Sequence, residues 1–165
     1  GWLKFKNLNK NSIGIEISNS GHKNNYKNFS KKQIISLVKL SNHLIKKFKI
    51  KSNFILGHSD IAPDRKQDPG EKFPWKLLSK KKIGIWHNLN SKVLAKERNN
   101  KTNNIDKKKF ISNLYNIGYP VNYKIKKTIY KKFLIEAFQR RFRQELINGI
   151  IDKECLIISE NLLKK

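Results

Sequence analysis

The residues most able to do chemistry lie close together between Gly57 and Gly70. His58 carries a metal-binding imidazole, Asp68 follows ten positions later, and Lys66 lies two positions before Asp68. Residues two positions apart in an extended segment project to the same side, so Lys66 and Asp68 can face one ion. Imidazole nitrogen and carboxylate oxygen are ligands that zinc accepts. The spacing therefore outlines a hydrolytic metal site.

A surface turn is the alternative interpretation of the same run. Pro63, Asp64, Pro69 and Gly70 all favour turns, and a carboxylate in a loop is usually solvated. Two ligand types also do not define a metal site by themselves. The preceding run 53–56 is short, apolar and bounded by polar residues, which predicts a buried strand delivering His58 to a cleft.

A second run, residues 11–19, carries a carboxylate among β-branched residues. Ile13, Ile15 and Ile17 alternate on one face of a predicted strand, and Glu16 points to the other face with Gly14. On the pattern alone, that second face is directed either to solvent or to a functional site.

Together the two runs resemble the zinc-dependent type 2 N-acetylmuramoyl-L-alanine amidases, over about residues 8–86. The resemblance implies an enzyme that hydrolyses the amide between N-acetylmuramic acid and L-alanine in peptidoglycan or its muropeptides. It implies that His58 and Asp68 bind Zn²⁺, that Glu16 transfers protons and that Lys66 stabilises the oxyanion. The family's first zinc histidine lies on an earlier strand. Because the chain starts at Gly1 and has no methionine, we expect it to begin after that histidine.

The surrounding pattern predicts the elements that position these residues. A helix is expected over 29–48, where Ser30 and Gln33 match a capping box. Strand, helix, strand and metal loop in that order predict an α/β domain over 1–87, with a central β-sheet flanked by helices. His22, His43 and His87 are predicted to be surface residues outside the zinc shell.

The rest of the chain changes character. Residues 88–105 are polar and predict a mobile linker, and 106–165 carry three helical patterns that predict a small C-terminal three-helix bundle. Asp106 and Asp152 are the expected caps of its first and last helices, and Gly118 the expected end of the first. The runs 137–143 and 148–152 resemble a peptidoglycan-binding helical domain. A generic helical module remains the alternative.

Composition limits the partners. The chain of 165 residues has 37 basic and 12 acidic residues, a formal charge of +25, which raises nucleic-acid binding as a rival. The lysines are dispersed and only five basic residues are arginine, so no nucleic-acid partner is expected and an anionic envelope polymer suits the charge better. One cysteine, Cys155, excludes an internal disulfide and is expected to be a buried apolar residue. No run approaches the roughly 18 apolar residues of a membrane span.

Three functions follow from these observations. The first is a peptidoglycan amidase in the periplasm or cell envelope of a Gram-negative bacterium, since envelope members of the family pair the catalytic domain with such a bundle. The second is a non-catalytic wall-binding protein of the same fold, and the third a cationic nucleic-acid-binding module. Assembly state and any preference for the anhydro sugar do not follow from the sequence.

Overall fold

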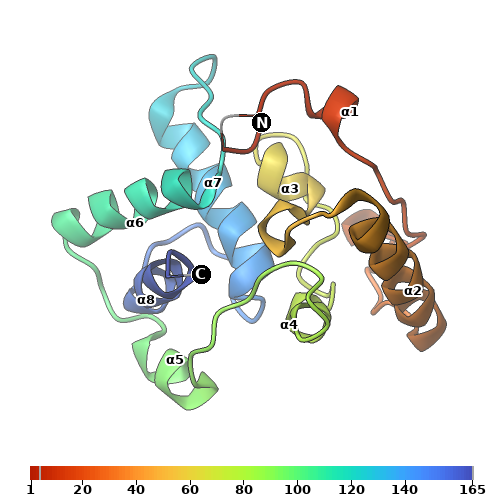
Figure 1. The fold of residues 1–165 in the computed structure, drawn as a ribbon. Coiled ribbons are helices and arrows are strands. Elements are labelled where there is room, and N and C mark those ends of the chain that lie inside the picture. The colour runs from red at the N-terminus through yellow and green to blue at the C-terminus, as the bar shows by residue number, and fades with distance from the viewer. Residues whose placement is uncertain (4, 165) are drawn as a thin grey trace.

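The computed structural model describes residues 1–3 and 5–164, and helices dominate that part of the chain (Figure 1). The helices are α1 Leu8–Asn11, α2 Lys31–Phe48, α3 His58–Ile61, α4 Trp75–Ser79, α5 Ser91–Glu97, α6 Asn104–Ile117, α7 Lys127–Phe142 and α8 Lys153–Leu162, with short 3-10 turns at His22–Asn24 and Ser52–Phe54. Within the described residues, no helix is long and apolar enough to cross a bilayer.

The predicted central β-sheet is wrong. Among the described residues the β-pairing consists of two isolated bridges, Trp2 with Phe5 and Lys101 with Asp152. Residues 12–20 run without regular structure, and Ile13 and Ile15 are 50% and 39% exposed. Alternation of side chains reports two faces of a segment, but a sheet also needs a neighbouring strand to pair with.

The run 53–56 shows what replaces the sheet. It begins in the turn Ser52–Phe54 and continues as extended backbone. Its carbonyls accept hydrogen bonds from side chains: the Trp2 indole donates to Asn53 at 3.2 Å and the Arg141 guanidinium to Ile55 at 2.9 Å. Backbone groups that a strand partner would have satisfied are therefore satisfied by distant side chains.

The predicted helices are confirmed, with one cap corrected. The Ser30 hydroxyl accepts from the Gln33 amide, and the Gln33 side chain accepts from the Ser30 amide, so the capping box of α2 is present. Asp152 caps α8, accepting from the Cys155 amide at 2.9 Å. Asp106 is not the cap of α6: Asn103 is, and Asp106 completes a capping box three residues later. The sequence pattern identified the correct first turn of α6, but it assigned the cap to Asp106 instead of Asn103.

The apolar residues gather in two clusters. The larger cluster joins α5, α6, α7 and α8, and it also contains Trp2 from the start of the chain. The smaller cluster contains Leu37 of α2 and Trp75 and Leu78 of α4. Trp86 packs against both clusters. Figure 1 shows α7 in the middle of the molecule, and contacts link it to α3 as well as to α6.

The segment predicted as a mobile linker contains α5. Its Leu94 is buried in the larger cluster, and Arg98, which follows α5, donates two hydrogen bonds to the buried Glu154 at 2.7 and 2.8 Å. A residue buried among apolar neighbours and a charge-assisted pair both restrict motion of the backbone that carries them.

The run 137–143 builds the turn before α8. Gln139 is fully buried, and its side chain donates to the Ile150 carbonyl while accepting from the amides of Asn148 and Gly149. Arg143 pairs with Asp152, the cap of α8. The side chains of this motif thus have structural partners inside the bundle.

A substitution at Gly118 would test how closely the N-terminal segment packs against this bundle. It ends α6 with φ +133°, and a Cβ placed there would lie 2.6 Å from the Trp2 ring. We expect Gly118→Ala to lower the free energy of unfolding by about 1–3 kcal/mol, because strain and overlap add. Gly14→Ala is the matched control, since a Cβ at Gly14 meets nothing within 4 Å. Equal denaturant midpoints for the two variants would contradict the described packing.

Candidate functional site

His58 and Asp68 lie side by side. The His58 Nδ1 and Asp68 Oδ2 atoms are 3.0 Å apart, and the two side chains are 41% and 61% exposed. His58 is the first residue of α3, and the amide of the next residue, Ser59, donates to the Asp68 carbonyl at 2.9 Å. The backbone bond keeps both ends of the loop together, so the two predicted ligands meet at the surface.

The distance between these atoms suits a shared metal ion. Two ligands each about 2.0–2.1 Å from a tetrahedral zinc lie about 3.3 Å apart. The observed 3.0 Å between nitrogen and oxygen is close to that separation, and the donor types are those that zinc accepts. Within residues 1–3 and 5–164, however, no group of three His, Cys, Asp or Glu side chains is arranged to hold a metal. Among the described residues, only the two predicted ligands, His58 and Asp68, are therefore brought together here.

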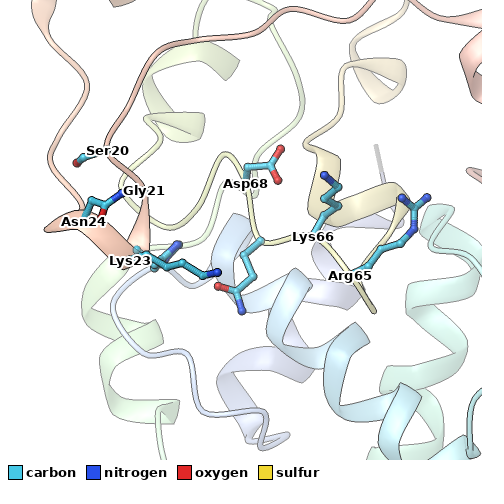
Figure 2. A pocket seen from close by; sticks show the side chains of 9 residues that line it. Ser20, Gly21, Lys23, Asn24, Arg65, Lys66 and Asp68 are labelled. Carbon is cyan, nitrogen blue, oxygen red and sulfur yellow. The ribbon is translucent and has the colours of Figure 1, made fainter.

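Lys66 belongs to the same loop. Its amide donates to the Ala62 carbonyl at 3.0 Å, which turns the chain back toward Asp68. Figure 2 shows the side chains of Lys66 and Asp68 on the same side of the loop. The expected common orientation of Lys66 and Asp68 is therefore present.

A depression of about 330 Å³ lies next to this loop. Figure 2 shows its two walls, one formed by residues 20–24 and the other by residues 65–68. Lys23, Arg65 and Lys66 contribute cations to it, and Asp68 lies at its edge. A surface lined mainly by cations attracts anionic groups.

Tyr26 holds the far end of the loop. Its hydroxyl donates to the Pro69 carbonyl at 2.5 Å and accepts from the Lys72 amide at 3.2 Å. Burial raises the pKa of Tyr26 to about 12. Gly70 has φ +80°, and a Cβ there would lie 2.5 Å from the Tyr26 hydroxyl oxygen. The close approach of the tyrosine therefore requires glycine at this position.

A buried ion pair supports the other end of the loop. Asp60, in α3, is fully buried and pairs with Arg141 of α7. The second carboxylate oxygen accepts from the Tyr119 hydroxyl at 2.9 Å. Burial raises the pKa of Tyr119 well above its ordinary value, and the neighbouring Asp60 charge adds to this, so the hydroxyl stays protonated and donates.

Glu16 is exposed, and within the described chain it makes no hydrogen bond or ion pair with His58 or Asp68. Its segment is nevertheless anchored to α2, because the Gln33 side chain donates to the Ser18 carbonyl at 2.6 Å. Ile17 packs against the smaller apolar cluster. The backbone of Glu16 is therefore held next to the core, while its role stays a prediction.

The remaining histidines are not equivalent. His43 is exposed on α2, and His22 is also exposed and pairs with Glu71 at 2.9 Å. The prediction of a surface position is wrong for His87, which is 8% exposed and lies 5.0 Å, ring to ring, from Trp86. His87 directly follows Ile85 and Trp86, and this local sequence did not indicate that the chain turns inward there.

Sequence reasoning missed Asp60, Tyr119 and Arg141. Asp60 was hidden inside the motif that carries His58, and Arg141 inside a run attributed to the bundle. One available signal was the scarcity of arginine: of the five arginines, Arg98, Arg140, Arg141 and Arg143 all form ion pairs with carboxylates in the structure. Arginine binds carboxylates through a fixed fork, which lysine does not offer.

Comparisons with known proteins agree on one relationship. Residues 1–71 match the family described as N-acetylmuramoyl-L-alanine amidase. The chain is 33% identical over 169 residues to the N-acetylmuramoyl-L-alanine amidase AmiD of Escherichia coli K12, covering 99% of this chain and 61% of AmiD. It is 43% identical over 65 residues to the 1,6-anhydro-N-acetylmuramyl-L-alanine amidase AmpD of Haemophilus influenzae, over 39% of this chain and 33% of AmpD.

Two solved structures share the fold. The structure of E. coli AmiD in complex with anhydro-N-acetylmuramic acid-L-Ala-D-γ-Glu-L-Lys has a TM-score of 0.83 at 32% identity, over 99% of this chain and 65% of that chain. AmpDh3 from Pseudomonas aeruginosa has a TM-score of 0.83 at 30% identity, over 99% and 66%. The chain thus spans a little under two thirds of these relatives.

The Tyr26 hydroxyl should lose its proton only at high pH. Because its pKa in the folded protein, about 12, lies above the ordinary 10.0, the stabilisation it provides is complete below pH 10 and is lost as the pH rises through 12. The measurement is the difference in phenolate absorbance between the parent protein and Tyr26→Phe, recorded by stopped flow before alkaline unfolding. A difference that titrates near pH 10 would show that the Tyr26 hydroxyl is not buried as described, because burial is the main cause of the raised pKa.

Proposed function

We propose that the chain belongs to the type 2 N-acetylmuramoyl-L-alanine amidases, which it resembles in sequence and fold, and that the whole protein hydrolyses the amide between N-acetylmuramic acid and L-alanine in peptidoglycan or its muropeptides. The observation that carries the proposal is the approach of His58 Nδ1 and Asp68 Oδ2 to 3.0 Å, with Lys66 on the same side of the loop as Asp68. A pair of this kind at the surface, next to a cationic depression, suits a hydrolytic site better than an ordinary turn.

We propose that His58 and Asp68 hold Zn²⁺ and that the third ligand is the histidine expected from the resemblance. A catalytic zinc takes three protein ligands, and His58 and Asp68 would be two of them. When bound, zinc polarises the scissile carbonyl and lowers the pKa of a water molecule.

The chain's own residues would do the rest. Glu16 would accept the proton of the attacking water and pass it to the leaving amine of L-alanine. Lys66 would place its ammonium beside the oxyanion that develops on the former carbonyl oxygen, without binding the metal. The backbone bond from Ser59 to Asp68 would keep the ligands at a fixed separation during the reaction.

The setting proposed for this reaction is the periplasm or cell envelope of a Gram-negative bacterium. Its support is the resemblance of residues 106–165 to a peptidoglycan-binding domain, together with similarity to AmiD that extends over 99% of the chain. The proposed boundaries are a catalytic part up to residue 87, a connection over 88–105 and the helical part beyond it.

Activity itself is tested on the full-length protein with purified muropeptides. We expect release of peptides that begin with L-alanine, abolished by a chelator and restored by Zn²⁺. Retention on insoluble cell wall without any cleavage would favour the non-catalytic wall-binding function.

Removing the proposed base should separate chemistry from metal binding. We expect Glu16→Gln in the full-length protein to lower kcat by about 10²–10⁴-fold, the usual contribution of a general acid–base, while zinc content stays at the parent level. Glu145→Gln, at a side chain that is 68% exposed, is the matched control. Unchanged turnover of Glu16→Gln would remove Glu16 from the mechanism.

Removing a proposed ligand should abolish both properties. His58→Ala is expected to lose bound zinc and turnover together, since a catalytic site cannot keep its ion on one fewer protein ligand. His43→Ala, at an exposed histidine of α2, should keep both. Stoichiometric zinc in the His58→Ala protein, measured by atomic absorption, would show that the site lies elsewhere.

A further inference from the structure

Helix α7 reaches from the C-terminal helical part to the loop that carries His58. Arg141, in the last turns of α7, pairs with Asp60, which lies two residues after His58. The two partners are separated by 81 positions in the sequence, and their side chains are 2% and 1% exposed. The contact is therefore a buried link between two parts of the chain that the sequence suggests are separate.

Every oxygen of the Asp60 carboxylate has a donor. Oδ2 accepts from Arg141 and from the Gly57 amide at 2.7 Å, and Oδ1 accepts from Tyr119 at 2.9 Å. Arg141 also donates to the Ile55 carbonyl at 2.9 Å and stacks 4.1 Å from the centre of the Trp75 ring. The guanidinium therefore binds Ile55, which precedes Gly57, and Asp60, which follows it.

Gly57 has almost no free space in this arrangement. A Cβ there would lie 2.9 Å from Pro69, 3.3 Å from Asp60 and 3.4 Å from Trp75. The residue before α3, Gly57, is thus closely packed between the Asp60 side chain and Pro69. A shift of Asp60 would move the backbone on which His58 stands.

Removing either charge would leave the other buried without a partner. An unpaired buried charge is strongly unfavourable, so loss of Arg141 should make the α3 turn reorganise to bring Asp60 to water. Lysine cannot replace Arg141, because one ammonium does not reach Asp60 and Ile55 in the planar geometry of the fork.

We infer that Arg141 is a positioning residue for the His58–Asp68 pair, acting through Asp60, so that helix α7 sets the geometry of the candidate metal site. The part of this inference that concerns zinc rests on the proposed function. The part that concerns the loop does not, since it is a property of the chain without metal.

The first experiment needs no metal. The Ser59 amide, which donates to Asp68, reports whether the two ends of the loop are closed. In the metal-free full-length protein, we expect Arg141→Met and the milder Arg141→Lys to speed hydrogen exchange at Ser59 at least tenfold. Amides in the middle of α2, for which no hydrogen bond or ion pair with Arg141 is seen in the described residues, should keep their exchange rates.

Arg140→Met is the matched control. Arg140 precedes Arg141 on the same helix and pairs with Glu136 of α7 instead of with the loop. Its removal should leave Ser59 exchange within twofold of the parent rate. If Arg141→Met accelerates exchange in α2 as much as at Ser59, or leaves Ser59 unchanged, the inference is overturned.

The second experiment measures zinc affinity by competition with a chromogenic chelator, below the unfolding temperature of each variant. We expect the Kd for Zn²⁺ to weaken by 10–100-fold in Arg141→Met and in Asp60→Asn, as for other residues that orient metal ligands. The double variant should be little weaker than either single one, because both remove the same link.

Tyr119→Phe provides a variant that keeps the ring and removes one hydrogen bond to Asp60. It should fold and weaken zinc binding less than Arg141→Met does. A Kd within twofold of the parent value in folded Arg141→Met would overturn the inference. Failure of the parent protein itself to bind zinc would instead overturn the proposed function, and Ser59 exchange would still decide the role of Arg141.

Discussion

The buried ion pair between Asp60 and Arg141 is the interaction on which the arrangement of the site depends. Two charges removed from water are tolerated when they are paired and hydrogen-bonded, and here Gly57, Tyr119 and Ile55 supply hydrogen bonds beside the ion pair, although the Arg141 Nε has no hydrogen-bond partner among the described residues. The pair joins α3, which carries His58, to α7, the helix at the centre of the larger apolar cluster. The exposed donors of the candidate site are therefore supported by a network that is itself out of contact with solvent.

The molecule positions its loops without a sheet in the described residues. Around residues 53–57, backbone groups find their partners in the side chains of Trp2, Arg141 and Asp60. Such partners lie far away in the sequence, and they make the local backbone depend on the packing of the helical part. This dependence explains how residues predicted as a linker and a separate bundle share one apolar cluster with Trp2.

The charge of the chain divides between two kinds of side chain. Lysines give most of the +25, and those of the site, Lys23 and Lys66, line the depression beside Asp68. Four of the five arginines instead form ion pairs, as Arg98 and Arg143 do around α8 and Arg141 does around α3, whereas Arg65 lines the depression. A planar guanidinium that holds several acceptors at once suits a buried position, whereas an ammonium suits a hydrated surface.

The sequence by itself determined the residues that face each other at the site and the helices that surround them. His58, Lys66 and Asp68 are linked by short spacing, and the caps of α2 and α8 are local hydrogen bonds, so a pattern of neighbouring residues contains them. Only the tertiary structure decided that residues 11–19 have no strand partner among the described residues, that His87 is buried, and that Arg141 holds Asp60. Each of these depends on which distant segments come together. Such pairing is set by the packing of the whole chain, which local spacing does not encode.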